Sequence, residues 1–391
     1  MDFRRKGNVN MDFELNEEQK NISEAARKFA LGEFPQIAIE FDREEKFPMD
    51  IWKKAVELGF TAIFLDEQYG GLGLGLLEQS LVTEEFWRVD PGVGCVLLSV
   101  FGSEVIQDHG TDAQKSKYLP MVTGGEAIFG CAITEANAGS DIFSVRSKAV
   151  KKDGGYVLNG SKMFITNGSI ADFLLVFCIT NPEAKSRYEK YSFLLLDTKT
   201  EGFEADKLNG KMGIRASDTA SLSFSDVLIP EVNLLGGQEG KGFRQVMECF
   251  NFNRIIAGSQ GVGVAQGALD LAVKYMKERE QFGKPLTSFQ GLQFKLAEMA
   301  SRVEAARALV RMGAWMIDNG TLDPKIVSIA KLVAGETAVR VTDEALQLHG
   351  GYGYMDEYHV ERFYRDAKIV EIYEGAKEIE KITVANEILR A

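Results

Sequence analysis

The sequence predicts an α+β protein with three domains in the order helical, β and helical. Helical periodicity runs from about residue 15 to 127, short strand-like runs fill 128 to 235, and long helical periodicity returns from about 241. A chain of 391 residues is long enough to bury two or three such cores. We therefore expect an N-terminal helical domain over 11–127, a β-domain over 128–240 and a C-terminal bundle over 241–391. Residues 1–10 are expected to form a disordered extension.

The N-terminal helices are predicted from capping and spacing. Asn16 with Gln19 three residues later is typical of a capped helix start, and apolar residues between 22 and 29 follow at helical spacing. A second amphipathic helix is expected from Met49 onward. The glycine-rich stretch 69–75 is similar to a phosphate-cradling loop. No strand precedes it and no Lys-Ser/Thr pair follows it, so we interpret it as a connection between helices.

The middle domain is predicted from short apolar and β-branched runs that turn signals at 153–155 and 167–168 separate. Six runs are expected to be strands: 127–134, 156–160, 163–166, 173–180, 191–197 and 220–227. Because no helical pattern lies between them, they favour an antiparallel barrel or sandwich.

The C-terminal domain is predicted to be a four-helix bundle. Four stretches have helical periodicity: 243–275, 290–318, 323–349 and 366–389. Pro285 and Pro324 lie at the joints between them. Within the last stretch, Gly375 interrupts the pattern directly after Glu374. A glycine there costs about 1 kcal/mol relative to alanine, which favours a functional or packing reason. One interpretation is that Glu374 faces a cleft that a ligand enters; the other is a solvated carboxylate beside a helix break.

Composition excludes several function classes. A formal charge of −12 argues against nucleic acid as a partner, and no 18-residue apolar run or signal-peptide pattern indicates a membrane. Three histidines and four scattered cysteines form no cluster at metal spacing, so we expect no metal site. Cysteines 95, 131, 178 and 249 lie in apolar surroundings. We expect them to be buried free thiols in a reducing, cytoplasmic setting.

Five motifs occur in a fixed order. They are AITEANAGSD at 132–141, GSKMFITNG at 160–168, REQFGKPL at 279–286 with Gln290 after it, QLHGGYG at 347–353, and RDAK at 365–368 before YEG at 373–375. Together they resemble the acyl-CoA dehydrogenase family, over nearly the whole chain from about 13 to 390. The resemblance implies non-covalently bound FAD, an acyl-CoA substrate, electron-transfer flavoprotein as the electron acceptor, and a homotetramer that is a dimer of dimers.

The resemblance also implies roles for individual residues. Glu374 would remove the α-proton of the thioester, and the flavin would accept the β-hydride at N5. The expected cofactor contacts are Cys131, Ile133, Thr134, Ser140, Phe164, Ile165, Thr166, Arg279, Phe282, Gln290, Gln347, Gly350, Gly351, Ala376 and Glu378, with those from Arg279 to Gly351 partly serving a neighbouring subunit. The expected substrate contacts are Ser140, Asn251, Arg254, Gly375, Asp90 and Leu97. A base between a flavin and an apolar acyl tunnel is desolvated, so a raised pKa is expected for Glu374.

The chain departs from the family pattern at three places. The usual Glu-Gly-Thr-Ser is EGAK at 374–377, the usual Asp-x-x-Arg begins with Asn251, and the aromatic of the flavin block is Phe164 where Trp is common. A branch of the family acting on branched and long chains places its base just before that arginine. Here Asn253 stands at this position, so the base is expected at Glu374 instead.

The substrate is expected to be a short-chain or cyclic acyl-CoA. Residues 88–98 are expected to line the acyl end of the pocket, and no arginine stands at Gly94 to pair with a terminal carboxylate. Glutaryl-CoA is therefore disfavoured. Asp90 has two interpretations, a helix-end residue before Pro91 or a second acid/base for a cyclic acyl-CoA. Two other functions stay open on the same fold, a flavin oxidase and a non-catalytic assembly factor. An intact Glu374 and complete flavin motifs argue against the second.

Overall fold

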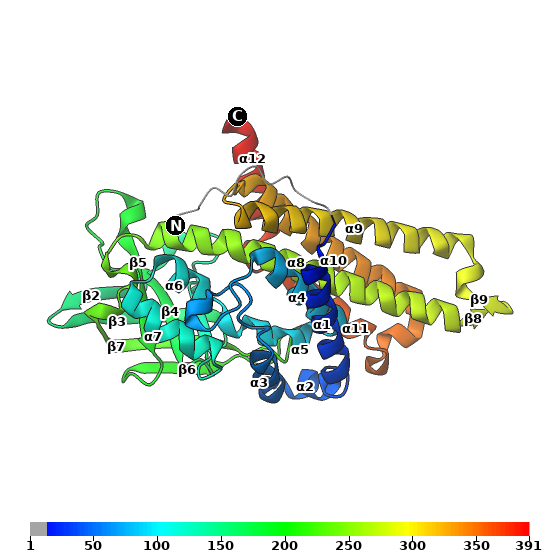
Figure 1. Cartoon of the computed structure of the whole chain (residues 1–391), viewed down its shortest axis with the longest axis horizontal. Helices are drawn as coiled ribbons and strands as arrows, with labels where there is room; N and C mark the ends of the chain where they lie inside the picture. Colours follow the sequence, from blue (N-terminus) through cyan, green and yellow to red (C-terminus); the bar gives the residue numbers. More distant parts are fainter. Residues whose placement is uncertain (1–13, 391) are drawn as a thin grey trace.

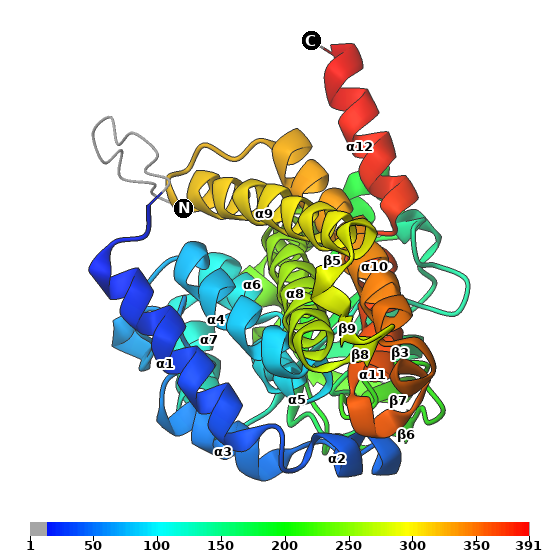
Figure 2. The same ribbon diagram turned by 90° about the vertical axis from the view of Figure 1, so that its right-hand side faces the viewer.

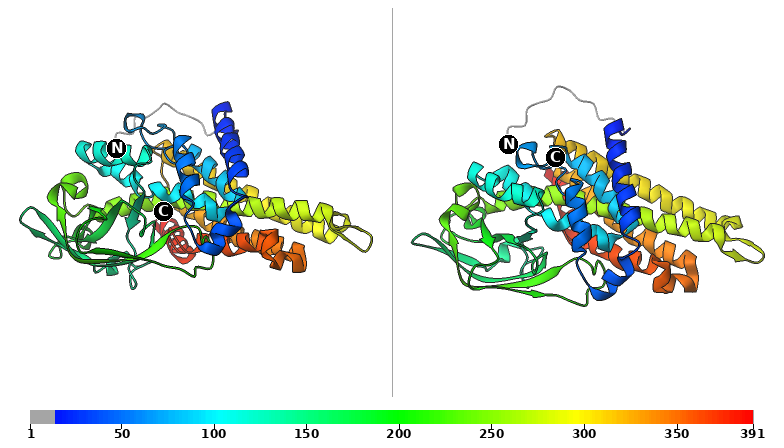
Figure 3. Two further views of the ribbon diagram at one scale, coloured as in Figure 1. Left: turned by 90° about the horizontal axis from the view of Figure 1, so that it is seen from below. Right: turned by 60° about the horizontal axis from the view of Figure 1, so that its bottom comes forward.

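The protein is an elongated molecule with a sheet at one end and long helices reaching the other (Figure 1). The computed structural model describes residues 14–390; the predicted extension at 1–10 lies outside them. In Figure 3 the curled sheet and the free ends of α8, α9 and α10 lie at opposite ends, and the N-terminal helices cross between them. The predicted α+β class and its helical, β, helical order are confirmed.

The N-terminal part is helical, as predicted. Its helices are α1 (Glu17–Glu33), α2 (Ala38–Glu44), α3 (Met49–Glu57), α4 (Leu76–Val89), α5 (Pro91–Gly94), α6 (Ser103–His109) and α7 (Asp112–Thr123). The predicted cap of α1 is present, because Asn16 and Gln19 bond each other's backbone N–H. Glycines 70–75 belong to the connection between a 3₁₀ turn and α4, which confirms the interpretation as a linking loop.

The middle part is one seven-stranded sheet. Its strands are β1 (Phe129–Ala132), β2 (Lys148–Lys152), β3 (Gly155–Thr166), β4 (Phe173–Ile179), β5 (Tyr191–Asp197), β6 (Phe203–Lys207) and β7 (Thr219–Pro230). The order is β1-β4-β2-β3-β7-β6, with β5 beside β4. The expectation of a purely antiparallel sheet is wrong in one respect, because β4 runs parallel to β1 and to β2. The β2–β3 hairpin separates β1 from β4 in sequence, which leaves room for a parallel return.

Two strands were missed and two predicted strands proved to be one. The strands β2 and β6 are largely exposed and rich in charge, so their sequences lack the apolar runs on which the prediction rested. The predicted strands 156–160 and 163–166 are both part of β3, which pairs with β7 through register shifts between Leu158 and Gly160 and between Lys162 and Ile165. Such bulges bend a strand without ending it.

The C-terminal part is built on α8 (Gly242–Glu278), α9 (Gln290–Asp318) and α10 (Pro324–His349), followed by α11 (Val360–Ala367) and α12 (Lys377–Arg390). A small hairpin, β8 (Glu280–Gln281) and β9 (Lys284–Pro285), joins α8 to α9. The prediction of one helix over 366–389 is wrong. The chain passes from α11 through a 3₁₀ turn, Lys368–Glu371, and leaves helical geometry before α12 begins. Figure 2 shows α12 projecting from the body of the molecule.

Short 3₁₀ turns complete the structure: Glu67–Tyr69, Cys95–Val100, Ile142–Ser144, Arg187–Lys190, Glu231–Asn233, Leu235–Gly237, Leu286–Ser288, Gly350–Tyr354, Asp356–Tyr358 and the turn at Lys368–Glu371.

The helical parts at both ends of the chain share one core. Buried Phe86 and Trp87 of α4 belong to the same apolar cluster as Val262 and Ala265 of α8. The two helices approach so closely that a side chain at Gly263 would collide with the α4 backbone. The helices at the two ends of the chain therefore form one rigid body. All four cysteines are buried and unpaired, as predicted. Over residues 14–390, no helix is both long and apolar enough to cross a membrane.

Candidate active site

Glu374 lies in the break between α11 and α12, on a backbone that few side chains adopt. Its φ is 52° and that of Gly375 is 101°, both in the left-handed region. A side chain at position 375 would collide with Oε1 of Glu380, one turn into α12. Glycine is therefore required here for two reasons, its conformational freedom and the close approach of Glu380. The glycine that the sequence analysis singled out is the residue that turns Glu374 out of the helical path.

Side chains from three helices, α8, α10 and α12, hold the Glu374–Gly375 turn in place. The guanidinium of Arg254 on α8 donates to Oε1 of Glu380 on α12 at 2.9 Å, and both side chains are buried. A second nitrogen of Arg254 donates to Oδ1 of Asn251 at 3.0 Å. Lys331 of α10, also buried, donates to the carbonyl oxygen of Gly375. Because these bonds join α8, α10 and α12 at one point, the position of Glu374 is fixed by the packing of the bundle.

The carboxylate of Glu374 is in an unusual electrostatic state. The residue is half-buried, but its Oε2 is shielded from solvent and has no hydrogen-bond partner among the described residues. Burial raises the pKa of Glu374 to about 7, with opposing contributions from nearby Lys331 and Arg254 and a further increase from Glu104. A carboxylate whose pKa lies near neutral pH is suited to accept and return protons. The direction agrees with the sequence expectation.

A second buried carboxylate, Glu104 of α6, lies close to Glu374. Its Oε1 accepts from Nδ2 of Asn253 at 2.8 Å and from Sγ of Cys249 at 3.3 Å, and its Oε2 accepts from the N–H of Gly102 at 2.9 Å. Burial raises the pKa of Glu104, and these hydrogen bonds oppose that increase. Sequence reasoning missed Glu104, because a carboxylate in a short helix normally indicates a solvated face.

The two motifs of the β-domain, 132–141 and 160–168, lie side by side. The N–H of Met163 on β3 donates to the carbonyl of Thr134 at 2.9 Å. Beneath them, the buried Lys162 donates to the carbonyl of Ile133 at 2.8 Å and to Glu135 at 3.0 Å. Phe164 stands out from this sheet with φ 61° and 66% of its surface exposed. An exposed aromatic ring on a constrained backbone is a feature that packing within the chain does not explain.

The remaining predicted residues of this region occupy mixed positions. Cys131 and Ile133 are buried, Thr134 and Thr166 are half-buried, and Ser140 is exposed. The Ile165 side chain is 2% exposed and packs in the sheet core, so its backbone alone can face a ligand. Ala376 is half-buried and its carbonyl starts α12, whereas Glu378 is exposed.

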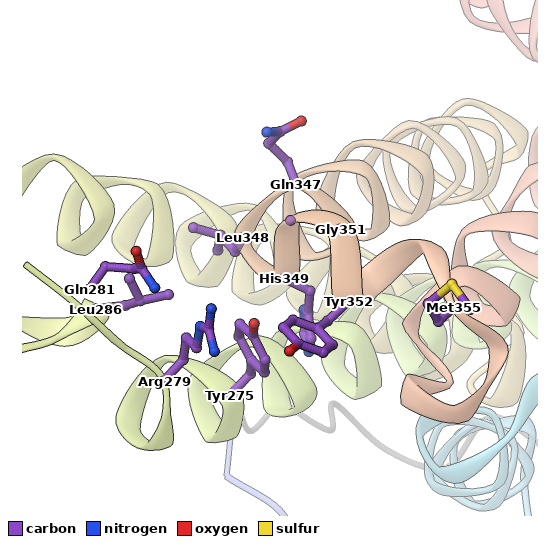
Figure 4. Close-up of a pocket in the computed structure, with 11 residues that line it drawn as sticks. Tyr275, Arg279, Gln281, Leu286, Gln347, Leu348, His349, Gly351, Tyr352 and Met355 are labelled. Carbon is purple, nitrogen blue, oxygen red and sulfur yellow. The ribbon is translucent and has the colours of Figure 1, made fainter.

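A second group of predicted residues surrounds a cavity of about 530 Å³ at the far end of α8. Figure 4 shows Tyr275, Arg279 and Tyr352 next to one another between the ends of α8 and α10, with Gln347 pointing away from them. The Arg279 guanidinium lies 5.2 Å from the centre of the Tyr352 ring. Gly350 and Gly351 have open space where a side chain would stand. Phe282 and Gln290 are exposed nearby, Phe282 with 92% of its surface free.

Within one chain, the predicted residues near Glu374 and Phe164 (the first group) lie far from those around the Arg279 cavity (the second group). Cys249, beside the first group, and Arg279, in the second, are 30 residues apart along α8. At about 1.5 Å per residue they are separated by roughly 45 Å. The residues expected to hold the flavin ring and those expected to hold the adenine side therefore lie at opposite ends of the long helix.

Asp90 occupies the helix-end position that the sequence analysis gave as one of its two interpretations. Its Oδ1 accepts from the N–H of Val93 at 2.9 Å and caps α5, and its Oδ2 accepts two hydrogen bonds from Arg362, at 2.6 and 3.0 Å. The Asp90 side chain is 2% exposed. Both oxygens are occupied, so the structure gives no support to substrate contact or acid/base work by Asp90. Leu97 is likewise a core residue, 6% exposed.

The structure also accounts for two departures from the family pattern. Arg254 lacks an acidic partner at Asn251, and Glu380 supplies one from α12. Lys377, where a hydroxyl is usual, lies 3.3 Å from Glu371, which also binds Lys368. Arg254 was expected to contact the substrate; in this structure its guanidinium is buried against Glu380, so its place is beneath the Glu374–Gly375 turn.

Comparison with known proteins gives a consistent result over nearly the whole chain. The acyl-CoA dehydrogenase N-terminal, middle and C-terminal domains match residues 16–126, 130–227 and 240–389. The chain is 44% identical to an acryloyl-CoA reductase (NADH) of Anaerotignum propionicum, over 97% of this chain and 96% of that one. It is 41% identical to a short-chain specific acyl-CoA dehydrogenase of Clostridium acetobutylicum, over 97% and 100%. It is 39% identical to a cyclohex-1-ene-1-carbonyl-CoA dehydrogenase of Syntrophus aciditrophicus, over 96% and 91%.

Two solved structures have the same fold. Butyryl-CoA dehydrogenase from Megasphaera elsdenii superposes with a TM-score of 0.93 at 39% identity, covering 97% of this chain and 100% of that one. A chain solved in work on the electron transferring flavoprotein of Acidaminococcus fermentans superposes with a TM-score of 0.94 at 40% identity and the same coverage.

Proposed function

The chain belongs to the acyl-CoA dehydrogenase family, and we propose that it oxidises a short-chain acyl-CoA between its α and β carbons with Glu374 as the base. Family membership makes it an FAD-dependent oxidoreductase acting on a CH–CH bond. The observation that carries the proposed mechanism is Glu374, whose Oε2 is buried, unpartnered and held at a required glycine turn. A structural carboxylate at such a place would be paired.

The residues present fit FAD. Phe164, with 66% of its surface exposed, offers a ring for stacking, and Thr134 and Thr166 offer hydroxyls beside it. Arg279 and the unobstructed approach to the backbone at Gly350 and Gly351 suit a pyrophosphate, because a guanidinium binds phosphate oxygens and no side chain blocks the approach. When bound, FAD supplies the acceptor for the hydride that leaves the β carbon.

The chain's own contribution is proton transfer and positioning. Glu374 removes a proton from the α carbon, so that the C–H bond breaks as an O–H bond forms on the carboxylate. Because burial raises the pKa of Glu374 to about 7, its protonated and ionised forms are close in free energy at neutral pH. Lys331 and Arg254 hold the turn and limit the cost of ionisation. By microscopic reversibility the same carboxyl can return a proton, and the relative named acryloyl-CoA reductase is compatible with this site used in the reverse direction.

The acyl group is proposed to be short and uncharged. Relatives named for butyryl-CoA and for short chains support this length. Gly94 is buried and carries no cation to bind a dicarboxylic acyl group, and a β carbon there would lie 3.0 Å from the Trp87 ring, so a larger residue requires that ring to shift. A cyclic acyl-CoA stays a second candidate through the relative named for cyclohex-1-ene-1-carbonyl-CoA. Asp90, the residue that first suggested a cyclic substrate, accepts a hydrogen bond from Arg362 and so has a structural role.

A second copy of the chain is proposed to complete the FAD site. The two groups of cofactor residues lie roughly 45 Å apart along α8, farther than one FAD molecule can bridge. The projecting α12 exposes Ile382, Ile388 and Leu389, which calls for an apolar partner. We propose a homotetramer built as a dimer of dimers. Electron-transfer flavoprotein is the proposed acceptor, and four buried free thiols support a cytoplasmic location.

The test is anaerobic titration of the FAD-loaded enzyme with butyryl-CoA, cyclohexanecarbonyl-CoA and glutaryl-CoA, scored by bleaching of the flavin. Butyryl-CoA should bleach it fastest and glutaryl-CoA should not bleach it. Reoxidation by electron-transfer flavoprotein but not by air supports a dehydrogenase, and rapid reoxidation in air would instead indicate an oxidase. A folded, FAD-loaded enzyme that no thioester bleaches would overturn the proposal in favour of an assembly factor.

A further inference from the structure

Glu104 is a buried carboxylate beside the catalytic segment for which the reaction as described gives no role. It is 5% exposed, and its hydrogen-bond partners Asn253, Cys249 and Gly102 are all neutral. A buried carboxylate is normally paired with a cation, because desolvation of an unpaired charge is expensive. A site that surrounds Glu104 with neutral donors suits a group that changes its protonation state.

After Glu374 has taken a proton from the substrate, the bound product blocks the direct route from this carboxyl group to solvent. The proton therefore needs another way out of the site. Four charged groups act on Glu374: Lys331, Arg254, Glu380 and Glu104. Lys331 donates to the carbonyl oxygen of Gly375, and Glu380 is occupied by Arg254 at 2.9 Å. Within the described part of the chain, Glu104 is thus the neighbouring carboxylate without a cationic partner. Consecutive residues of α8 link the two carboxylates: Asn253 donates to Glu104, and the adjacent Arg254 binds Glu380 beside the Glu374–Gly375 turn.

From Glu104, helix α6 leads toward the surface. Asp108 lies four residues later, so the two carboxylates occupy the same face one turn apart. Asp108 is half-buried and faces Glu104, Glu248 of α8 and Lys115 of α7. The adjacent His109 lies 2.7 Å from Glu248, and Glu248 accepts from Arg244, whose side chain is 77% exposed. Titratable groups therefore follow one another from Glu104 on α6 to the exposed Arg244 on α8.

We propose that Glu104 receives the substrate-derived proton from Glu374 and passes it to Asp108, so that α6 is the proton exit of the active site. In the first step the O–H bond on Glu374 breaks and one forms on Glu104. In the second step the O–H bond on Glu104 breaks and one forms on Asp108, which then releases the proton to solvent. No electrons are transferred. The proposal rests on the proposed role of Glu374 as base. Glu104 acts through Glu374, so it is a positioning and relay residue that does not itself attack the substrate.

The pKa shifts of these groups are consistent with proton transfer from Glu374 through Glu104 to Asp108. Burial raises the pKa of Glu374 to about 7, and it raises the pKa of Asp108 to about 7 with additions from Glu104 and Glu248. Burial also raises the pKa of Glu104. Glu374 and Asp108, at the two ends of the proposed path, have similar pKa values, so moving the proton from one to the other costs little free energy. If the neighbouring carboxylates had ordinary pKa values, about 2.5 below that of Glu374, the proton would stay on Glu374.

The test measures exchange of the methyl protons of acetyl-CoA with D₂O by proton NMR, using the FAD-loaded enzyme. Acetyl-CoA has no β carbon and cannot be oxidised, so exchange needs a base that removes a proton and then trades it with solvent. Glu104→Gln should exchange at least tenfold more slowly than wild type at equal FAD content. Its pH profile should also shift to lower pH, because one negative charge near Glu374 is lost. Asp108→Asn should slow exchange as well.

A matched control is Asp318→Asn, since burial also raises the pKa of Asp318, to about 6, but both of its carboxylate oxygens accept from the backbone N–H groups at the start of α4. It should exchange like wild type. Exchange by FAD-loaded Glu104→Gln within twofold of wild type would overturn the relay. If Glu104→Gln fails to bind FAD, Asp108→Asn decides, because its side chain is half-buried. If Glu374→Gln exchanges like wild type, the proposed base is wrong, whatever Glu104 does.

Discussion

Replacing Glu374 with glutamine should stabilise the protein above neutral pH while it inactivates the enzyme. The fold raises the pKa of this carboxyl from its ordinary 4.5 to about 7 by burying it without a hydrogen-bond partner for Oε2. The folded state therefore holds the proton more tightly than the unfolded state. This group lowers the free energy of unfolding as pH rises from about 4.5 to 7, and the loss is complete above about pH 7.

The magnitude follows from the two pKa values. A difference of about 2.5 corresponds to about 3 kcal/mol at 1.36 kcal/mol per pKa unit. Glu374 is half-buried as a residue, so solvent screening reduces this to about 1–2 kcal/mol. Glutamine keeps the shape and carries no charge. Glu374→Gln should thus match wild type near pH 4.5 and exceed it by about 1–2 kcal/mol at pH 8, a rise of a few degrees in Tm.

The assay is thermal unfolding of both FAD-loaded proteins at equal concentration from pH 5 to 8. The exposed Glu357, replaced by glutamine, is the control and should show no pH-dependent difference from wild type. A Glu374→Gln variant that is less stable than wild type at pH 8, or whose difference does not change with pH, would refute the reasoning. Such a result would mean that the carboxylate is paired in solution and is not held ready to take a proton.

Three further outcomes are expected. Gly375→Ala places a side chain against Glu380 at φ 101°, so we expect a loss of about 2 kcal/mol or more and at least tenfold in flavin reduction rate, measured by thermal unfolding and stopped-flow. Asp90→Asn leaves Arg362 without its counter-charge and should cost about 3–5 kcal/mol in urea unfolding; the turnover rate per bound FAD should stay within twofold, and a larger loss would return Asp90 to the chemistry. Arg279→Gln should weaken FAD binding at least tenfold in fluorescence titration, and unchanged affinity would remove this residue from the cofactor site.

The sequence was informative where a residue type has one physical use. Gly375 after Glu374 predicted a break that presents a carboxylate, and the structure places the break there. The apolar periodicity of the same stretch, however, persists on both sides of Gly375. For that reason 366–389 was predicted as one helix, which the structure does not show. The exposed, charged strands β2 and β6 were not predicted for a related reason, since their sequences carry little of the apolar signal from which strands are inferred.

Other parts of the site depend on contacts between distant segments, which one sequence does not reveal. Glu104 becomes part of the site because α6 packs against α8 beside Asn253. Glu380 replaces the missing acidic partner of Arg254 from 126 residues away. The separation of Phe164 from Arg279 follows from the unbroken length of α8, and it is this separation that makes a second copy of the chain necessary for the proposed FAD site.

The central claim is that Glu374 takes the α-proton, and anaerobic stopped-flow reduction of the flavin by butyryl-CoA tests it most directly. Wild type and Glu374→Gln are compared at equal FAD content. We predict that the variant is slower by at least 10²–10⁴-fold, because glutamine cannot accept the proton and the other carboxylates nearby are engaged or more remote. Reduction of the variant within about threefold of wild type would contradict the account and make Glu104 the leading candidate for the base.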